Sequence, residues 1–280
     1  MDDRCDRVGG PTGGCLGSFE RRPHKRSLGL GYALDTGVSS SHLVFRLSGG
    51  ALTIRVLHIT DTHVFEDPDK QLYRRPVDEN LRRMLDKASE QGPFDLLLLR
   101  GDIAEDGFEA TYARVHALLE PYAGQVLAVP GNHDQPESMY RIFPEREIRQ
   151  DGWLIVGVDS HWPDHAEGRV SQSDLDQLRR QLVMTEAAHI MVAVHHPPHF
   201  MCEQSHCGLS QSTDLIEAVQ GTSVRVVTSG HVHDDFSHQI GPILFSSGPS
   251  TCIGFDHNPA GHRASSLTPG ALVYDLRQMG

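Results

Sequence analysis

The feature that most constrains this chain is a repeated pattern in which an apolar, strand-like run ends in a short cluster of Asp, Asn and His residues. The five clusters, in chain order, are Asp61-Thr-His63, Gly101-Asp102, Gly131-Asn132-His133-Asp134, His195-His196 and Gly230-His231-Val-His233. In α/β sheets that are covered on both faces, ligands gather at the carboxyl ends of the strands, where the loops converge. The pattern therefore predicts that these residues, far apart in the sequence, share one site.

The spacing of apolar residues predicts an α/β fold in which helices connect buried strands. Strands are expected at residues 54–59, 94–99, 126–129, 153–158, 189–194 and 224–228. Helices are expected at residues 77–90, 108–119, 171–184 and 215–219. The last third is predicted to be rich in strands, at 235–240, 242–246 and 272–276. Such continuous apolar strands are typical of sheets that are covered on both faces.

The first 50 residues differ from the rest, because they are rich in Gly, Ser and Arg and have little apolar periodicity. We expect residues 1–50 to form a flexible N-terminal extension, with one isolated strand at 43–47, and residues 51–280 to form a single domain. No apolar segment follows a basic start, so a secretory signal is not expected.

Composition excludes several classes of protein. The formal net charge of −12 argues against stable binding to nucleic acid, which needs clustered Lys and Arg. No window approaches 18 consecutive apolar residues, so no association through a membrane span is expected. Five cysteines do not suggest a disulfide framework. Cys202 and Cys207 lack the spacing of a zinc site, and Cys252 either lines a pocket or packs beneath it.

The residue types of the clusters favour a transition-metal site. A mixture of carboxylate and imidazole suits Mn, Fe or Zn, whereas Ca sites use oxygen alone and structural Zn sites use mostly sulfur. The two-residue spacing of Asp61 with His63, and of His231 with His233, places each pair on one side of an extended segment. Two metal ions roughly 3.5–4 Å apart would share a carboxylate, clamp a phosphoryl group and activate water.

Together the motifs resemble a known family. The series D-x-H, G-D-x-x-[DE], G-N-H-D, H-H-P-P and G-H-x-H, in this order, is similar to that of the calcineurin-like metallophosphoesterases, over about residues 54–276. Residues 60–69, 194–198 and 248–252 further resemble the class III cyclic-nucleotide phosphodiesterase branch, which includes bacterial 3',5'-cyclic AMP phosphodiesterases. The resemblance implies a β-sandwich flanked by helices, in four αββα layers.

The resemblance also implies a role for each matching residue. One metal ion would be held by Asp61, His63 and His233, and a second by Asn132, His195 and His231, with Asp102 bridging the two. His133 would bind no metal and would either protonate the leaving group or stabilise the phosphate charge. A metal-bridging hydroxide would attack phosphorus in line, and Asn132 would add a hydrogen bond to the substrate.

Three positions leave alternatives open. Glu105 stands where the family often has an Asp that bonds the histidine of G-N-H, so Glu105 reaches His133, or Asp106 takes part, or His133 is oriented differently. Arg100 stands where small residues are common, and either pairs with a carboxylate or simply lies at a strand end. His196 is expected to support the site or shape its loop rather than to bind metal.

The expected function is metal-dependent hydrolysis of 3',5'-cyclic nucleotides or related small phosphodiesters. A phosphomonoesterase, a nucleotide pyrophosphatase or a glycerophosphodiesterase would use the same core. A scaffold without catalysis is disfavoured, because all seven expected ligands are present together with His133. The absence of a signal, the few cysteines and the substrate class favour the cytoplasm. Relatives of this kind are often dimers, which leaves a homodimer open.

Overall fold

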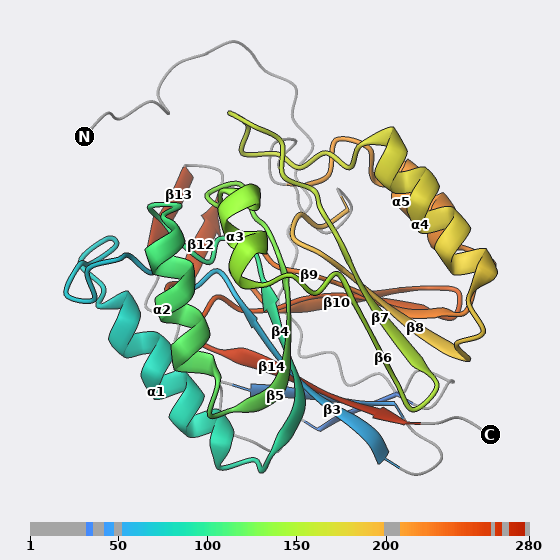
Figure 1. The fold of residues 1–280 in the computed structure, drawn as a ribbon, viewed down its shortest axis with the longest axis horizontal. Helices are drawn as coiled ribbons and strands as arrows, with labels where there is room; N and C mark the ends of the chain where they lie inside the picture. Colours follow the sequence, from blue (N-terminus) through green and yellow to red (C-terminus); the bar gives the residue numbers. More distant parts are fainter. Residues whose placement is uncertain are drawn as a thin grey trace.

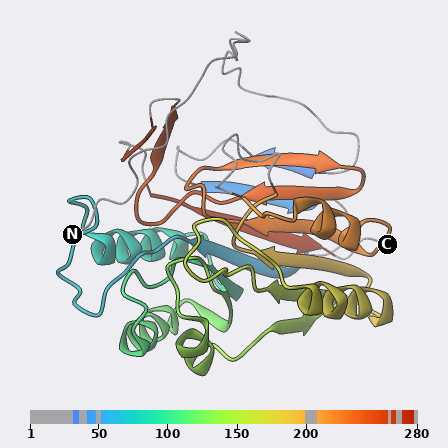
Figure 2. The same ribbon diagram turned by 90° about the horizontal axis from the view of Figure 1, so that it is seen from above.

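The fold was analysed in a computed structural model, which describes residues 32–35, 42–47, 52–198, 208–258, 261–264 and 269–277. Two six-stranded sheets pack face to face, and helices lie against their outer faces (Figures 1 and 2). The expected sandwich flanked by helices is therefore confirmed. Among the described helices, none combines the length and the apolar character needed to cross a membrane. Cys202 and Cys207 lie outside the described residues.

The first sheet has the order β1-β2-β14-β3-β4-β5. Its strands are β1 (Tyr32–Asp35), β2 (His42–Leu47), β3 (Leu52–Thr60), β4 (Phe94–Arg100), β5 (Ala123–Val129) and β14 (Ala271–Arg277). β3, β4 and β5 are parallel, so their carboxyl ends meet at one edge. The helices α1 (Val77–Ser89) and α2 (Glu109–Leu119) connect them and cover the outer face.

The second sheet has the order β10-β11-β9-β8-β7-β6. Its strands are β6 (Glu147–Gln150), β7 (Trp153–Val158), β8 (His189–Val194), β9 (Val224–Ser229), β10 (Phe236–Ile240) and β11 (Ile243–Ser247). The helices α4 (Gln172–Met184) and α5 (Ser212–Val219) cover its outer face. A short helix, α3 (Pro136–Ile142), follows β5, and β12 (Phe255–Asn258) and β13 (Gly261–Ala264) form a separate antiparallel pair.

Alternation along the central strands explains the layers. Leu97 and Leu99 of β4 pack with the covering helices, whereas Leu96 and Leu98 of the same strand pack between the two sheets. Because all four side chains are fully buried, the sequence of the strand is a continuous apolar run and does not alternate between apolar and polar residues. Burial of each such side chain contributes roughly 1.5–3 kcal/mol.

The N-terminal part differs from the expectation in one respect. The strand expected at 43–47 is present as β2, but it is not isolated, because it pairs with β1 and lies parallel to β14. The sheet therefore begins before residue 50. Local patterning cannot indicate a pairing between residues that stand at opposite ends of the sequence, such as Val44 with Val273. The elements α3, β6, β12 and β13 were also not predicted.

Candidate metal centre

The predicted ligand residues come together where strands of the two sheets end. Asp61 follows β3 and Asp102 follows β4 in the first sheet, whereas His195 and His231 follow β8 and β9 in the second. The backbone N–H of His231 donates to both carboxylate oxygens of Asp61 at 3.1 Å. His195 Nε2 lies 3.5 Å from Asp102 Oδ2 and 3.9 Å from Asp61 Oδ1. The face-to-face packing of the sheets thus joins clusters that are up to 170 residues apart.

The backbone at this edge adopts an uncommon conformation. Five of the predicted ligands have positive φ angles: Asp61 (53°), His63 (45°), Asp102 (49°), His231 (69°) and His233 (55°). Residues other than glycine rarely occupy this left-handed region, and such strain concentrates at functional sites. Each loop therefore turns sharply as its strand ends, and the turn directs the side chain into the shared space.

One group of donors consists of Asp61, His63 and His233, which lie close enough together to hold a metal ion. His233 Nε2 is 3.3 Å from Asp61 Oδ1 and 3.2 Å from His63 Nε2. The outer nitrogens of both rings are already engaged, since His233 Nδ1 donates to the carbonyl of Ile253 at 2.6 Å and His63 Nδ1 lies 2.7 Å from Glu105 Oε2. These contacts orient both rings and leave both Nε2 atoms for a metal ion.

Two further groups that could hold a metal ion are His195 with His196 and His231, and Asp61 with Asp102 and His195. Asn132 follows Gly131, whose Cα lies close to Asp102 and His195. Within the described part of the chain, Asn132 Oδ1, both ring nitrogens of His195 and His231 Nδ1 are buried without a hydrogen-bond partner. Buried polar atoms are normally paired, so donor atoms of this kind need a ligand. The imidazole nitrogens of His195 and His231, the amide oxygen of Asn132 and the carboxylate of Asp102 are donor types that fit a transition metal ion.

Close packing around these groups requires glycine at neighbouring positions. A Cβ atom at Gly101 would collide with the ring of His195, and one at Gly131 would collide with Asp102. A Cβ atom at Gly230 would collide with the hydroxyl of Thr60. The glycines of the motifs therefore let the backbone approach the donor side chains.

The electrostatics of the site favour charged carboxylates at Asp61 and Asp102 and a neutral imidazole at His231. Burial alone would raise the pKa of Asp61, but the adjacent His233 and His195 hold it below its usual range. Burial likewise opposes ionisation of Asp102, and His195 outweighs it, so the pKa of Asp102 is also lowered. Burial and the nearby His195 lower the pKa of His231 to about 3, which keeps its ring neutral at physiological pH. Metal ions bind these forms.

His133 has a different environment. Its side chain is 40% exposed, and its Nδ1 atom lies 3.1 Å from Oε2 of Glu105. Burial opposes its protonation, but Glu105 and Asp102 raise the pKa of His133 to about 9. Glu105 thus reaches His133, as one of the sequence alternatives anticipated. Asp106 instead accepts hydrogen bonds from Thr111 Oγ1 and the N–H groups of Glu66 and Phe108.

Two supporting residues were missed by the sequence analysis. Asp134, buried behind the site, accepts hydrogen bonds from the N–H groups of Ile103, Ala104 and Gly131 and from the hydroxyl of Tyr112. Ser250 donates to the carbonyl of Asp61 at 2.8 Å and accepts from the N–H groups that follow it. The signal for Asp134 was its place at the end of G-N-H-D, whereas nothing local indicated a role for Ser250.

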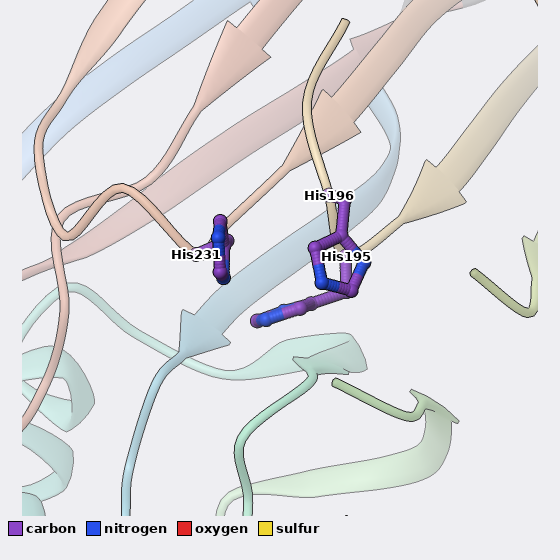
Figure 3. A group of neighbouring side chains, drawn as sticks. All are labelled: His195, His196 and His231. Carbon is purple, nitrogen blue, oxygen red and sulfur yellow. The ribbon is translucent and has the colours of Figure 1, made fainter. Parts of the chain in front are cut away.

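His196, Arg100 and Cys252 are all buried near the site. His196 is fully buried, its Nδ1 atom lies 2.8 Å from Ser160 Oγ, and its ring lies beside those of His195 and His231 (Figure 3). Arg100 is fully buried at the end of β4, where it donates to the carbonyl of Val194 at 3.0 Å across the two sheets. Cys252 is buried in the core beneath α1, and burial raises the pKa of its thiol.

Comparisons with known proteins agree with this arrangement. The chain is 32% identical, over 238 residues, to a probable cyclic nucleotide phosphodiesterase of Synechococcus, and the match covers 81% of this chain and 92% of the relative. It is 27% identical to the 3',5'-cyclic adenosine monophosphate phosphodiesterase CpdA of Pseudomonas aeruginosa, covering 78% and 84% of the two chains.

A solved structure shows the same fold at low sequence identity. The purple acid phosphatase PPD1 of yellow lupin superposes with a TM-score of 0.57 at 12% identity, covering 82% of this chain and 49% of that chain. The profile described as calcineurin-like phosphoesterase matches residues 54–235, which include all the predicted ligands. The chain is therefore a hydrolase of phosphoric esters that belongs to the calcineurin-like phosphoesterase family.

Proposed function

We propose that this chain is a dinuclear metal-dependent phosphodiesterase that hydrolyses 3',5'-cyclic nucleotides or related small phosphodiesters. The observation that carries the proposal is the pair of donor groups that adjoin at Asp61 and Asp102, where His195 Nε2 lies within 3.9 Å of both carboxylates. Relatives named as cyclic nucleotide phosphodiesterases support the substrate class. The proposed domain comprises residues 51–280, with residues 1–50 as an extension.

Each donor residue has a proposed role. Asp61, His63 and His233 would hold one metal ion, Asn132, His195 and His231 would hold the other, and Asp102 would contact both. When bound, Mn, Fe or Zn would supply Lewis acidity that activates water and neutralises the phosphoryl oxygens. The buried, unpartnered atoms of Asn132, His195 and His231 support the second set.

His133 would complete the reaction as a proton donor. Contact with Glu105 and the nearby Asp102 favour its protonated form, and its exposed ring can approach a substrate at the mouth of the site. In hydrolysis of a cyclic phosphodiester, water adds to phosphorus and one ribose oxygen departs. His133 would protonate that departing oxygen, which avoids release of an alkoxide.

The test is a comparison of substrates with purified, Mn-loaded protein. Cyclic AMP, cyclic GMP, ADP-ribose (a nucleotide pyrophosphate), 4-nitrophenyl phosphate, bis(4-nitrophenyl) phosphate and glycerophosphocholine would be assayed in parallel. The proposal expects the highest kcat/KM with a cyclic nucleotide. A preference for the monoester, for a pyrophosphate or for glycerophosphocholine would instead identify a phosphomonoesterase, a nucleotide pyrophosphatase or a glycerophosphodiesterase.

The proposal also covers the binding partner and the cellular compartment. A cyclic nucleotide or small diester is the expected partner, with the cytoplasm as the expected compartment. A preparation that binds no metal and hydrolyses none of the substrates would contradict the enzyme and favour a scaffold.

A further inference from the structure

An aromatic path leads outward from the candidate metal centre. The ring of Phe255, at the start of β12, lies 4.6 Å from the ring of His233. On its other side, Phe255 lies 6.1 Å from the ring of Tyr73, in the loop that follows β3. This loop and the β12–β13 pair lie at the same side of the molecule in both ribbon views (Figures 1 and 2). Tyr73 is thus two ring contacts from a predicted metal ligand.

Tyr73 presents a large aromatic side chain to solvent. It is 64% exposed. Its ring plane is inclined by 88° to that of Phe255, so the two rings meet edge to face rather than stacking. Each ring therefore keeps at least one face that their mutual contact does not cover. An aromatic face at the rim of a polar site is suited to stacking against another flat ring.

The backbone holds Tyr73 in this place at a cost. Tyr73 and Arg74 have φ angles of 47° and 62°, and the turn is closed by the hydrogen bonds between Leu72 and Arg75. Consecutive left-handed residues form the two-residue hairpin turn that normally favours Asn and Gly. With Tyr and Arg at these positions, the turn is strained yet closed on both sides, which restrains the backbone from which the Tyr73 ring projects.

We propose that Tyr73, backed by Phe255, forms a subsite that stacks on the nucleobase of a nucleotide whose phosphate lies at the metal centre. This inference rests on the proposed function and specifies its substrate class: the ligand carries an aromatic base, not merely a phosphodiester. Stacking of a base on an aromatic side chain gives about a 10-fold gain in affinity or more. Ligands with the same sugar phosphate but no base lack this gain.

Binding to the Mn-loaded protein tests the subsite without relying on turnover. Isothermal titration calorimetry would give the Kd of AMP and of ribose 5-phosphate, which differ by the base. We expect AMP to bind about 10-fold more tightly to the wild type and only about 1–2-fold more tightly to Tyr73→Ala. Tyr73→Phe should retain the wild-type ratio, because the phenyl ring stacks equally well.

Met184→Ala is the matched control. Met184 is 80% exposed and lies at the end of α4. The chain continues from there into the start of β8, at the edge of the sheet that is opposite to the site. In Met184→Ala, the ratio of the Kd values of ribose 5-phosphate and AMP should equal that of the wild type. Equal affinities of AMP and ribose 5-phosphate for the wild type, or an unchanged ratio in Tyr73→Ala, would overturn the subsite.

The outcome is separable from that of the proposed function. If the wild type hydrolyses cyclic AMP but the ratio does not respond to Tyr73→Ala, the function stands and the subsite is wrong. If the ratio falls in Tyr73→Ala but no cyclic nucleotide is hydrolysed, the base subsite stands and the proposed reaction is wrong.

Discussion

Nδ1 of His133 lies 3.1 Å from Oε2 of Glu105, a carboxylate that also contacts His63. Burial opposes protonation of His133, but Glu105 and Asp102 raise its pKa to about 9. If the protonated ring acts as the acid, kcat is sustained below that value and falls as pH rises through it. Glu105→Gln removes the largest favourable contact, so the alkaline limb should move to lower pH. The position of the alkaline limb would be measured from kcat values between about pH 6 and about pH 10. An unmoved limb would contradict the pairing.

His133→Ala separates catalysis from metal binding. Removal of a general acid typically lowers turnover by about 10²–10⁴-fold. Because His133 is not among the proposed ligands, the metal content measured by mass spectrometry should not change. His165→Ala, which removes an exposed imidazole in the loop after β7, should retain full activity. Undiminished turnover in His133→Ala would rule out the proton-donor role.

Gly101→Ala tests the close approach of backbone and His195. The added Cβ atom would collide with the imidazole, and the φ of 44° is unfavourable for alanine. We expect reduced metal content and loss of activity. Gly221→Ala has the same kind of strain, at a φ of 71°, but its Cβ would meet nothing within 4 Å. It should cost about 1 kcal/mol of stability and leave metal content intact. Equal metal content in both variants would show that the collision is unimportant.

Asp134→Asn tests the support behind the site. The carboxylate accepts from three backbone N–H groups and one hydroxyl, whereas an amide presents N–H groups to part of that set. The free energy of unfolding should fall by roughly 2–3 kcal/mol, measured by urea denaturation. Asp176→Asn, at a carboxylate of α4 that is 47% exposed, should change stability by less than about 0.5 kcal/mol. A similar small change in Asp134→Asn would contradict the supporting role.

The convergence of the Asp and His clusters could be predicted from the sequence, because the residues of each cluster stand close together and follow a strand. Asp61 with His63, and His231 with His233, are close in sequence and follow apolar strands. The structure brings these predicted residues together, although their metal-binding roles remain proposals. Whether Glu105 reaches His133 depended on the length of one side chain in three dimensions, and no sequence spacing could decide it.

The supporting contacts were less predictable because they are long-range. The bond from Ser250 Oγ to the carbonyl of Asp61 spans 189 positions, and the pairing of β2 with β14 joins opposite ends of the chain. Arg100 is similar: its bond to Val194 exists only because the two sheets face each other. Pattern and propensity describe a strand and its buried face, but not which distant strand completes the sheet.

The proposed function requires that the converging Asp, His and Asn side chains hold two metal ions that are needed for phosphodiester hydrolysis. The most direct test is to strip the protein with a chelator, titrate Mn back, and measure bound metal and cyclic AMP hydrolysis on the same samples. Activity should disappear with the metal and return fully as occupancy approaches about two ions per chain. Full hydrolysis by the stripped protein, or full activity at one ion per chain, would contradict it.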